Sequence, residues 1–251
     1  MTDFQLILLF PVRNAFSGRQ FLLAALIMLA GTVIPILPML IVMGYSARIM
    51  RQIIDEDREP TMLEWQGSDW GELLREGARL FVVQLIFILP VLLLMGCGFV
   101  FLMSSPFLLA PSDTGDPNAL SPVGIMTLVI GTGIFLVAML LSLPLGVIIG
   151  AAQSHAVTRQ SFQAALQVHE WWPIFRAGLG HFIGAYLFTM ILSFILSFAM
   201  QVAMITIVLI CVIPFIMFGY SAYIMLVLNA LFAKAYATGR RTIQMADHAP
   251  A

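Results

Sequence analysis

The residues that could carry chemistry in this sequence are concentrated in a few polar segments, and the first of these is acidic. Asp and Glu fill most of residues 55–59. Such a run could bind a hard cation through its carboxylate oxygens, but it lacks the glycine and the distal glutamate of a calcium-binding loop. The simpler interpretation is a solvated loop, and we predict no metal site here.

Three histidines, His155, His169 and His181, lie in or beside a second polar segment, and Glu170 follows His169. Zinc ligands on a helix recur at a fixed spacing such as H-E-x-x-H, which places two imidazoles on one helix face. These histidines have no such spacing, so we predict neither a metal site nor a metal cofactor. A contact with a lipid headgroup, or an ordinary histidine at a membrane surface, would explain them.

Serine and threonine are scattered through apolar segments, without the G-x-S-x-G elbow of a hydrolase or an acidic partner. We therefore predict no catalytic residue, no cofactor-binding residue and no enzyme activity. The strongest polar side chains in or at the ends of the apolar segments are Gln84, Gln201 and Asn229. Such groups usually hydrogen-bond between membrane helices, and a substrate path is the alternative.

The chain that positions these side chains is too apolar for a water-soluble fold. Hydrophobic residues make up 61% and charged residues 10% of the sequence, whereas soluble domains carry roughly 25% charged residues. No Asp, Glu, Lys or Arg occurs in residues 20–47, 80–112, 117–158 and 177–233. The net charge of −1, without a basic cluster, also indicates no nucleic-acid partner.

These charge-free stretches predict about five membrane spans, since a bilayer core needs roughly 20 apolar residues in a helix. The spans are expected at about 20–44, 80–104, 122–150, 179–200 and 203–233. Continuous Leu, Ile, Met and Phe runs favour helices over a barrel, whose strands alternate. We therefore predict an all-α, polytopic transmembrane helix bundle, with residues 1–236 as a single membrane domain and 237–251 as a flexible cytoplasmic tail.

The basic residues predict an orientation. All but Arg13 and Arg19 of the twelve Lys and Arg lie in residues 45–79, in residues 151–178 or after residue 233. Because cytoplasmic segments are enriched in Lys and Arg, these segments and the C-terminus are expected in the cytoplasm and the N-terminus outside. If Pro35 and Pro38 instead turn the first span into a re-entrant hairpin, all twelve basic residues share one side.

Two sequence patterns recur in the same order. Gly44-Tyr45-Ser46-Ala47 returns as Gly219-Tyr220-Ser221-Ala222, with a weaker copy at Gly150, and W-x-x-[LI]-[LF]-R-x-G occurs at residues 70–77 and 171–178. Such self-similarity indicates repeated structural units. We predict two parallel repeats, at about 20–104 and 122–200, and a partial third at 203–233.

The polar segments 45–79 and 151–178, here called the first and second elbow, contain all four tryptophans. Trp70, Leu73 and Gly77 share one helix face and Glu72 and Glu76 lie opposite, which predicts an amphipathic helix with its apolar face in lipid. The residues expected to serve helix packing and interface anchoring are Gly44, Tyr45, Trp65, Trp70, Gly77, Gly150, Trp171, Trp172, Gly178, Gly219 and Tyr220.

The first elbow resembles the prokaryotic membrane family called domain of unknown function 4013. The matching residues are Gly44, Tyr45, Arg48, Pro60, Trp65, Trp70 and Gly77. The likeness covers most of residues 5–236 and is strongest over 44–92, although Met62 and Leu63 interrupt the family's Leu-Pro-x-Trp pattern. The resemblance implies a fold and a membrane location, and it implies no activity.

Together these features predict a non-enzymatic membrane protein of a prokaryotic plasma membrane, acting as a scaffold, an accessory subunit or a lipid-interacting component. Its expected partners are membrane lipids and other membrane proteins of a complex. The alternative is a small transporter or channel for an uncharged or apolar substrate. Ion- or proton-coupled transport is disfavoured because the spans carry no Asp, Glu, Lys or Arg.

Overall fold

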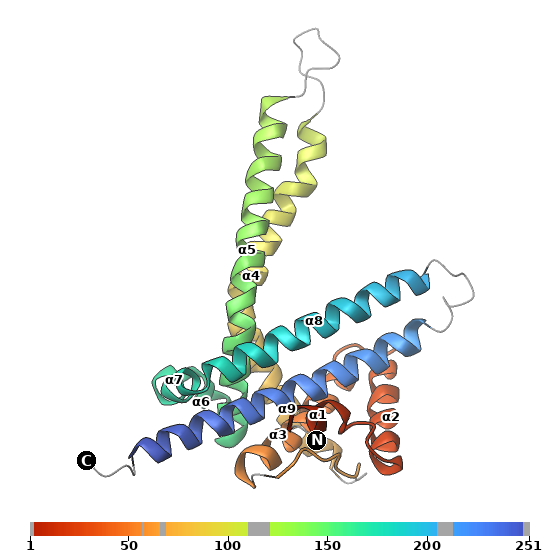
Figure 1. The fold of residues 1–251 in the computed structure, drawn as a ribbon. Coiled ribbons are helices and arrows are strands. Elements are labelled where there is room, and N and C mark those ends of the chain that lie inside the picture. Colours follow the sequence, from red (N-terminus) through yellow and green to blue (C-terminus); the bar gives the residue numbers. More distant parts are fainter. Residues whose placement is uncertain (1–2, 57, 66–68, 110–120, 205–212, 248–251) are drawn as a thin grey trace. The chain divides into compact units, whose positions relative to one another are not determined.

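The computed structural model describes residues 3–56, 58–65, 69–109, 121–204 and 213–247, and every regular element among them is a helix (Figure 1). The helices are α1 (Asp3–Leu9), α2 (Ala15–Ala30), α3 (Leu37–Asp55), α4 (Trp70–Leu108), α5 (Pro122–Thr158), α6 (Phe162–Leu166), α7 (Val168–Ala177), α8 (Leu179–Met204) and α9 (Ile213–Asp247). Helices α4, α5, α8 and α9 are long and apolar enough to cross a membrane. The predicted all-α membrane bundle is thus confirmed.

The last four predicted spans fall on these long helices, with differences at their ends. Helix α4 continues beyond the predicted span of 80–104, through Pro106 to Leu108, and residues 110–120 lie outside the described part of the chain. Residues 205–212, at the start of the predicted fifth span, also lie outside it. Pro90 and Pro144 lie inside α4 and α5, as membrane helices tolerate.

The first predicted span, 20–44, is two helices instead of one. Helix α2 ends at Ala30, and α3 begins at Leu37 with Pro38 in its first turn. Pro35 has no amide hydrogen to continue a helix, and Ile36 after it takes a φ of 77°, which ends the helical path. Helix α2 has 16 residues and is about 24 Å long, shorter than the roughly 30 Å core of a bilayer.

The turn between α2 and α3 is apolar and largely hydrogen-bonded within itself. Val33 is 81% and Ile36 58% exposed, although a turn in water is normally polar. Amides of the turn bond back into α2: Gly31 to the Met28 carbonyl and Val33 to the Ala30 carbonyl, at 3.0 and 3.1 Å. A turn of this kind suits a hydrocarbon surrounding, where unpaired backbone groups are costly.

The segments on either side of this hairpin meet on one face of the protein. The Arg13 guanidinium lies 3.2 Å from the Glu59 carboxylate, and the Trp65 indole donates to the Gln20 carbonyl at 3.1 Å. Residues at and before the start of α2 therefore lie beside the part of the first elbow that follows α3. This agrees with the re-entrant alternative and not with a first span that separates the two.

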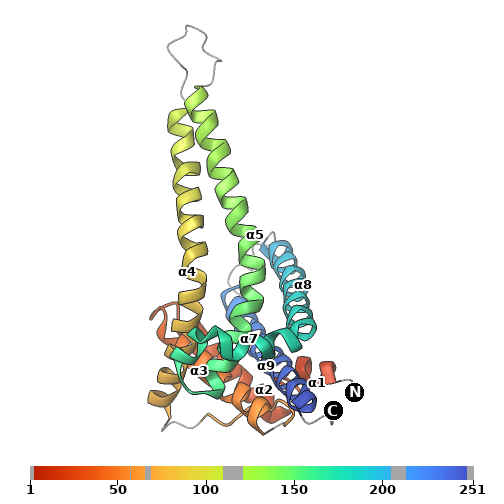
Figure 2. The ribbon, with the colours of Figure 1, turned by 90° about the vertical axis from the view of Figure 1, so that its left-hand side faces the viewer.

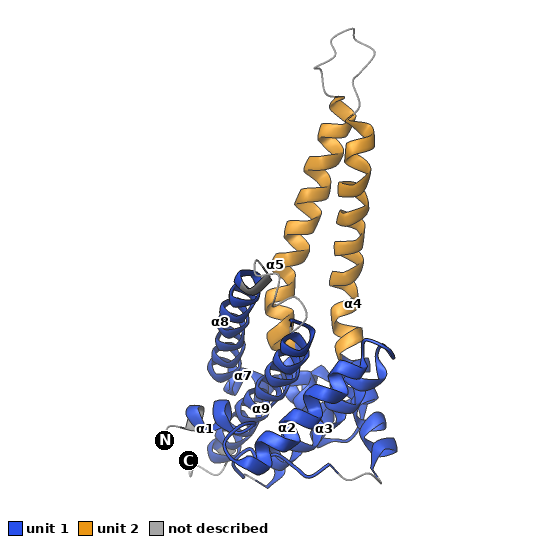
Figure 3. Cartoon of the chain, turned by 90° about the vertical axis from the view of Figure 1, so that its right-hand side faces the viewer, with its two compact units in different colours: residues 1–83, 149–251 blue, residues 84–148 orange. Residues whose placement is uncertain are grey.

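The chain divides into two compact units (Figure 3): unit 1 holds residues 1–83 and 149–251, and unit 2 holds residues 84–148. In unit 2, the later part of α4 and the earlier part of α5 run side by side (Figure 2). They approach closely at glycines, since a Cβ added to Gly131 would lie 2.8 Å from the Cβ of Phe101. Small residues allow this approach between membrane helices.

In unit 1 the central element is α9, against which α2, α3, α7 and α8 all pack. Buried side chains form continuous runs at residues 42–47, 150–157 and 229–233. Within this core the Asn229 amide donates to the Ser46 hydroxyl at 2.9 Å, which is the interhelical role expected for Asn229. Helix α9 also continues through residues 237–247, which were expected in a flexible tail; the remaining tail residues lie outside the described chain.

The glycines of the recurring patterns differ in how closely a neighbouring helix approaches them. At the crossing of α3 and α4, a Cβ added to Gly44 would collide with the Leu73 carbonyl, and one added to Gly77 with the Leu40 carbonyl. Gly178 in the second elbow is also tight, because its Cβ would lie 2.9 Å from the Ala235 carbonyl of α9. A Cβ added to Gly219 would meet nothing within 4 Å, so the two Gly-Tyr-Ser-Ala copies differ in packing.

The two proposed repeat units also differ in their elements. The first contains the α2–α3 hairpin followed by α4, whereas the second contains one continuous α5, the short α6 and α7, and then α8. Gly150 at the weaker copy packs against a side chain, with its added Cβ 2.5 Å from the Phe232 ring. The repeat therefore remains a prediction from the sequence patterns.

We predict that Gly77→Ala lowers the free energy of unfolding by about 1–3 kcal/mol, because the new methyl must displace backbone at the α3–α4 crossing. Gly219→Ala is the matched control and should change it by less than about 0.5 kcal/mol, since its site is open. Steric trapping in detergent or bicelles measures both variants. Equal stabilities for the two variants would contradict the packing assigned to Gly77.

Candidate functional site

Within the first elbow, a network of ion pairs joins α3 to the start of α4. From α3, Arg48 reaches Asp69 at 2.9 Å, Glu72 at 2.7 Å and Glu76 at 3.4 Å. Arg51, three residues further along α3, reaches the same Glu76 at 2.7 Å. Two arginines on one side and three carboxylates on the other thus join α3 to the start of α4.

Glu76 is the buried centre of this network, with 8% of its side chain exposed. A buried carboxylate is strongly destabilising unless it is paired, and here Arg48 and Arg51 supply the pairing. Burial by itself would lower the pKa of Arg48, but its hydrogen bond to Asp69 and the charges of Glu76 and Glu72 raise that pKa above the usual value. Arg48 therefore keeps its positive charge in this network.

This geometry corrects the predicted placement of the first elbow helix. Its apolar face was expected in lipid and its charged face in water. Instead Leu73 is 2% exposed and packs with Gly77 against α3, and Glu76 points inward to the arginines. The start of α4 is a packed protein element, because Arg48 and Arg51, three positions apart along α3, reach the carboxylates at the start of α4.

Aromatic rings close the same elbow. The Tyr45 and Trp65 rings stack with centroids 4.2 Å apart, and Trp70 follows at 5.9 Å from Trp65. The Tyr45 hydroxyl donates to the Leu63 carbonyl at 2.7 Å. Tyr45 and Trp65 therefore hold the connection between α3 and α4 in place, while Trp70 remains 39% exposed.

In the second elbow the adjacent tryptophans are placed differently. Trp171 is 1% exposed and its indole donates to the Ala165 carbonyl at 3.0 Å, so it belongs to the core. Trp172 is 41% exposed, as an interface anchor would be. Gly219 and Tyr220 are half-buried, and no close packing distinguishes Gly219.

One of the three histidines is central to a polar cluster. His155 is 3% exposed, with Nδ1 2.7 Å from the Tyr236 hydroxyl and Nε2 3.4 Å from the Glu170 carboxylate. Arg159 also approaches Glu170, at 3.4 Å. These side chains and Arg240 line a cavity of about 440 Å³. No cluster of three metal-ligating side chains occurs among the described residues, and His169 is exposed.

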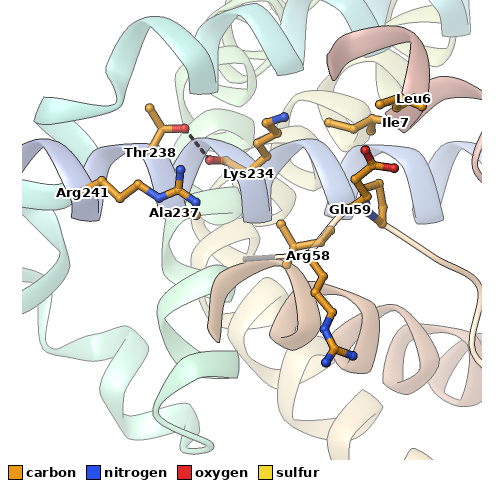
Figure 4. Close-up of a pocket in the computed structure, with 10 residues that line it drawn as sticks. Leu6, Ile7, Arg58, Glu59, Lys234, Ala237, Thr238 and Arg241 are labelled. Atoms are coloured by element: carbon orange, nitrogen blue, oxygen red, sulfur yellow. Dashed lines mark hydrogen bonds between the residues drawn. The ribbon is translucent and has the colours of Figure 1, made fainter. Parts of the chain in front are cut away.

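Two adjoining cavities lie around Lys234 of α9, and both are lined by Ile7, Lys234 and Thr238. The smaller, about 200 Å³, is also lined by Arg58, Glu59 and Arg241. Figure 4 shows Lys234, Thr238 and Arg241 along α9, with Leu6 and Ile7 of α1 and Arg58 and Glu59 around them. The larger, about 490 Å³, is completed by the start of α8, including His181.

The predicted residues thus separate into two kinds. Gly44, Tyr45, Trp65, Trp70 and Gly77 come together at the α3–α4 crossing, Gly150 and Gly178 lie against α9, and Trp171 is buried within the second elbow. The sequence alone did not single out Glu76 or Lys234 as residues of a site. Lys234 had a visible signal, as the first charged residue after the charge-free stretch 177–233.

The sequence was compared with known proteins. A family model described as a protein of unknown function (DUF4013) matches residues 26–209. No curated protein and no solved structure matches the chain. The matched range includes both elbows and the charged centre at Glu76, and it ends before Lys234.

We predict that Glu76→Gln destabilises the protein by about 2 kcal/mol, because it removes the carboxylate shared by the partly buried Arg48 and Arg51. Glu72→Gln is the matched control: Glu72 is 62% exposed, so the loss should be below about 1 kcal/mol. Chemical unfolding in mixed detergent micelles compares the two. A larger effect at Glu72 would show that the network is not centred on Glu76.

Proposed function

The chain belongs to the DUF4013 family of proteins of unknown function, and we propose that it is a non-enzymatic, lipid-interacting scaffold of a prokaryotic plasma membrane. The observation that carries this proposal is the exposure of its apolar helices. In the most apolar windows of α4 and α8, only 11% and 17% of the residues are buried. Apolar surface of this extent is covered either by lipid or by another membrane protein.

The distribution of charge supports an orientation for this scaffold. All twelve Lys and Arg lie within residues 1–83 and 149–251, so unit 1 contains every basic residue and unit 2 contains none. By the positive-inside rule, the polar segments of unit 1 are cytoplasmic. With α2 and α3 as a re-entrant hairpin and α4, α5, α8 and α9 each crossing once, both termini are in the cytoplasm.

A structural role is also supported by how the polar groups are used. The charges of the first elbow are engaged with one another across α3 and α4, and Asn229 bonds to Ser46 inside the helix core. A transporter for an uncharged or apolar substrate is the competing hypothesis. Coupled transport generally needs a charge at membrane depth, and the apolar stretches have no Asp, Glu, Lys or Arg.

The orientation is tested by single cysteines at Asn14, Ser161, Gln244 and Ser112 in a variant without Cys97 and Cys211. An impermeant thiol reagent should label only position 112 in intact cells, and all four positions after permeabilisation. Labelling of position 14 in intact cells would contradict the re-entrant hairpin. Labelling of positions 161 and 244 instead of 112 would invert the orientation.

The lipid-interacting role is tested by native mass spectrometry of the full chain purified in mild detergent. We expect phospholipid to remain bound, since the exposed apolar helices need a hydrocarbon cover. Stoichiometric copurification of another membrane protein without lipid would replace the lipid role by an accessory-subunit role. Flux of an uncharged solute through proteoliposomes, absent from protein-free vesicles, would favour the transporter.

A further inference from the structure

The larger cavity beside Lys234 lies at the depth where two membrane helices leave the apolar layer. Helix α8 begins at Leu179, and Lys234 is the first charged residue after the charge-free stretch 177–233. His181 of α8 and Lys234 of α9 line the same cavity, of about 490 Å³. The cavity is thus placed where the headgroups of a bilayer would meet the protein.

The walls of this cavity change from polar to apolar along both helices. On α9, Thr238 and Lys234 are followed one turn deeper by Leu231; on α8, His181 is followed by Gly184 and Ala185. Positions three or four apart share a helix face. The two helices therefore present polar groups at one end of the cavity and small or aliphatic groups at the other.

Glycine makes room for this cavity instead of closing the helices together. Gly178, just before α8, is in a tight crossing with α9, where an added Cβ would lie 2.9 Å from the Ala235 carbonyl. At Gly180 and Gly184, which line the cavity, an added Cβ would meet nothing within 4 Å. The helices touch at Gly178, and the next two glycines leave open space beside them.

Basic residues outnumber acidic ones around the polar end. The adjoining cavity shares Lys234 and adds Arg241 and Arg58, with Glu59 as its acidic member, and the Arg58 guanidinium is paired with Glu56 at 3.2 Å. The Glu59 carboxylate is paired with Arg13 at 3.2 Å, and this ion pair offsets its negative charge. A phosphate group complements such a surface, and basic residues at the cytoplasmic membrane surface attract anionic lipids.

We propose that the groove between α8 and α9 binds an anionic phospholipid. Its phosphate lies at Lys234, His181 and Thr238, and the upper part of an acyl chain lies along Gly184, Ala185 and Leu231. The volume falls within the range of about 300–1,000 Å³ of small-molecule sites, which suits a headgroup and the upper part of a chain. This inference rests on the proposed lipid-interacting role and adds the site and the lipid class.

The test titrates the full chain in detergent with phosphatidylglycerol or phosphatidylcholine and counts bound lipid by native mass spectrometry. Lys234→Gln should weaken phosphatidylglycerol binding about fivefold, as expected for one basic residue at an anionic surface, and leave phosphatidylcholine unchanged. Arg75→Gln, an exposed cation outside the groove, is the matched control and should have no effect. Equal phosphatidylglycerol binding by wild type and Lys234→Gln overturns the proposal.

A second variant keeps the proposal testable if Lys234→Gln does not fold. Gly184→Leu fills the groove and should reduce the binding of both lipids, whereas Gly133→Leu, at another open glycine, should not. Competition by millimolar inorganic phosphate that removes all bound phosphatidylglycerol would assign the site to a soluble anion and overturn the lipid. Lipid binding that is unchanged by both Lys234→Gln and Gly184→Leu refutes this inference alone, whereas a wild-type chain that binds no lipid refutes the proposed function.

Discussion

The crossing of α3 and α4 at Gly44 and Gly77 determines where most of the polar groups of unit 1 lie. With no side chain at either position, the two backbones approach until an added Cβ would strike the opposite carbonyl. At that separation Arg48 and Arg51 reach Glu76, and the Tyr45 ring reaches Trp65. A wider crossing would leave Glu76 buried without its partners, which is far more costly than the missing packing contacts.

Small residues also allow close helix approach along α9, in the rest of unit 1. This helix presents Ala230, Ala233 and Gly239 among its buried positions, so that α2, α3, α7 and α8 can all pack closely against it. An added Cβ at Gly239 would collide with the Ile174 carbonyl of α7. These small residues of α9 allow close approach at several points, while aromatic residues such as Phe232 of α9 and Phe182 of α8 fill the space between the helices.

The parts of the fold that depend on composition alone could be predicted from the sequence. The charge-free stretches located α4, α5, α8 and α9, because hydrocarbon excludes charge and requires helices. The break at Pro35 was ambiguous, since proline occurs both inside membrane helices, as at Pro144, and at their ends. The hairpin interpretation is supported by the tertiary contact of Arg13 with Glu59, which no local pattern contains.

In the candidate site, too, local sequence patterns do not determine the contacts between helices. The Gly-Tyr-Ser-Ala strings are nearly identical, yet Gly44 is at a crossing and Gly219 is open, because packing depends on which helix lies opposite. The two glycines that end the W-x-x-[LI]-[LF]-R-x-G patterns each meet a neighbouring helix, Gly77 against α3 and Gly178 against α9. The inward orientation of Glu76 depended on Arg48 and Arg51 lying across from it, a pairing between separate helices.

The apolar, internally hydrogen-bonded turn at residues 31–36 has a consequence for biosynthesis. A hairpin that enters and leaves the bilayer on one side does not require the preceding residues, with Arg13 and Arg19, to pass through the translocation channel. In the proposed orientation, only the connections between α4 and α5 and between α8 and α9 are exported, and neither contains a Lys or Arg. Insertion can then proceed as two successive helical pairs, with every basic residue retained at the side of synthesis.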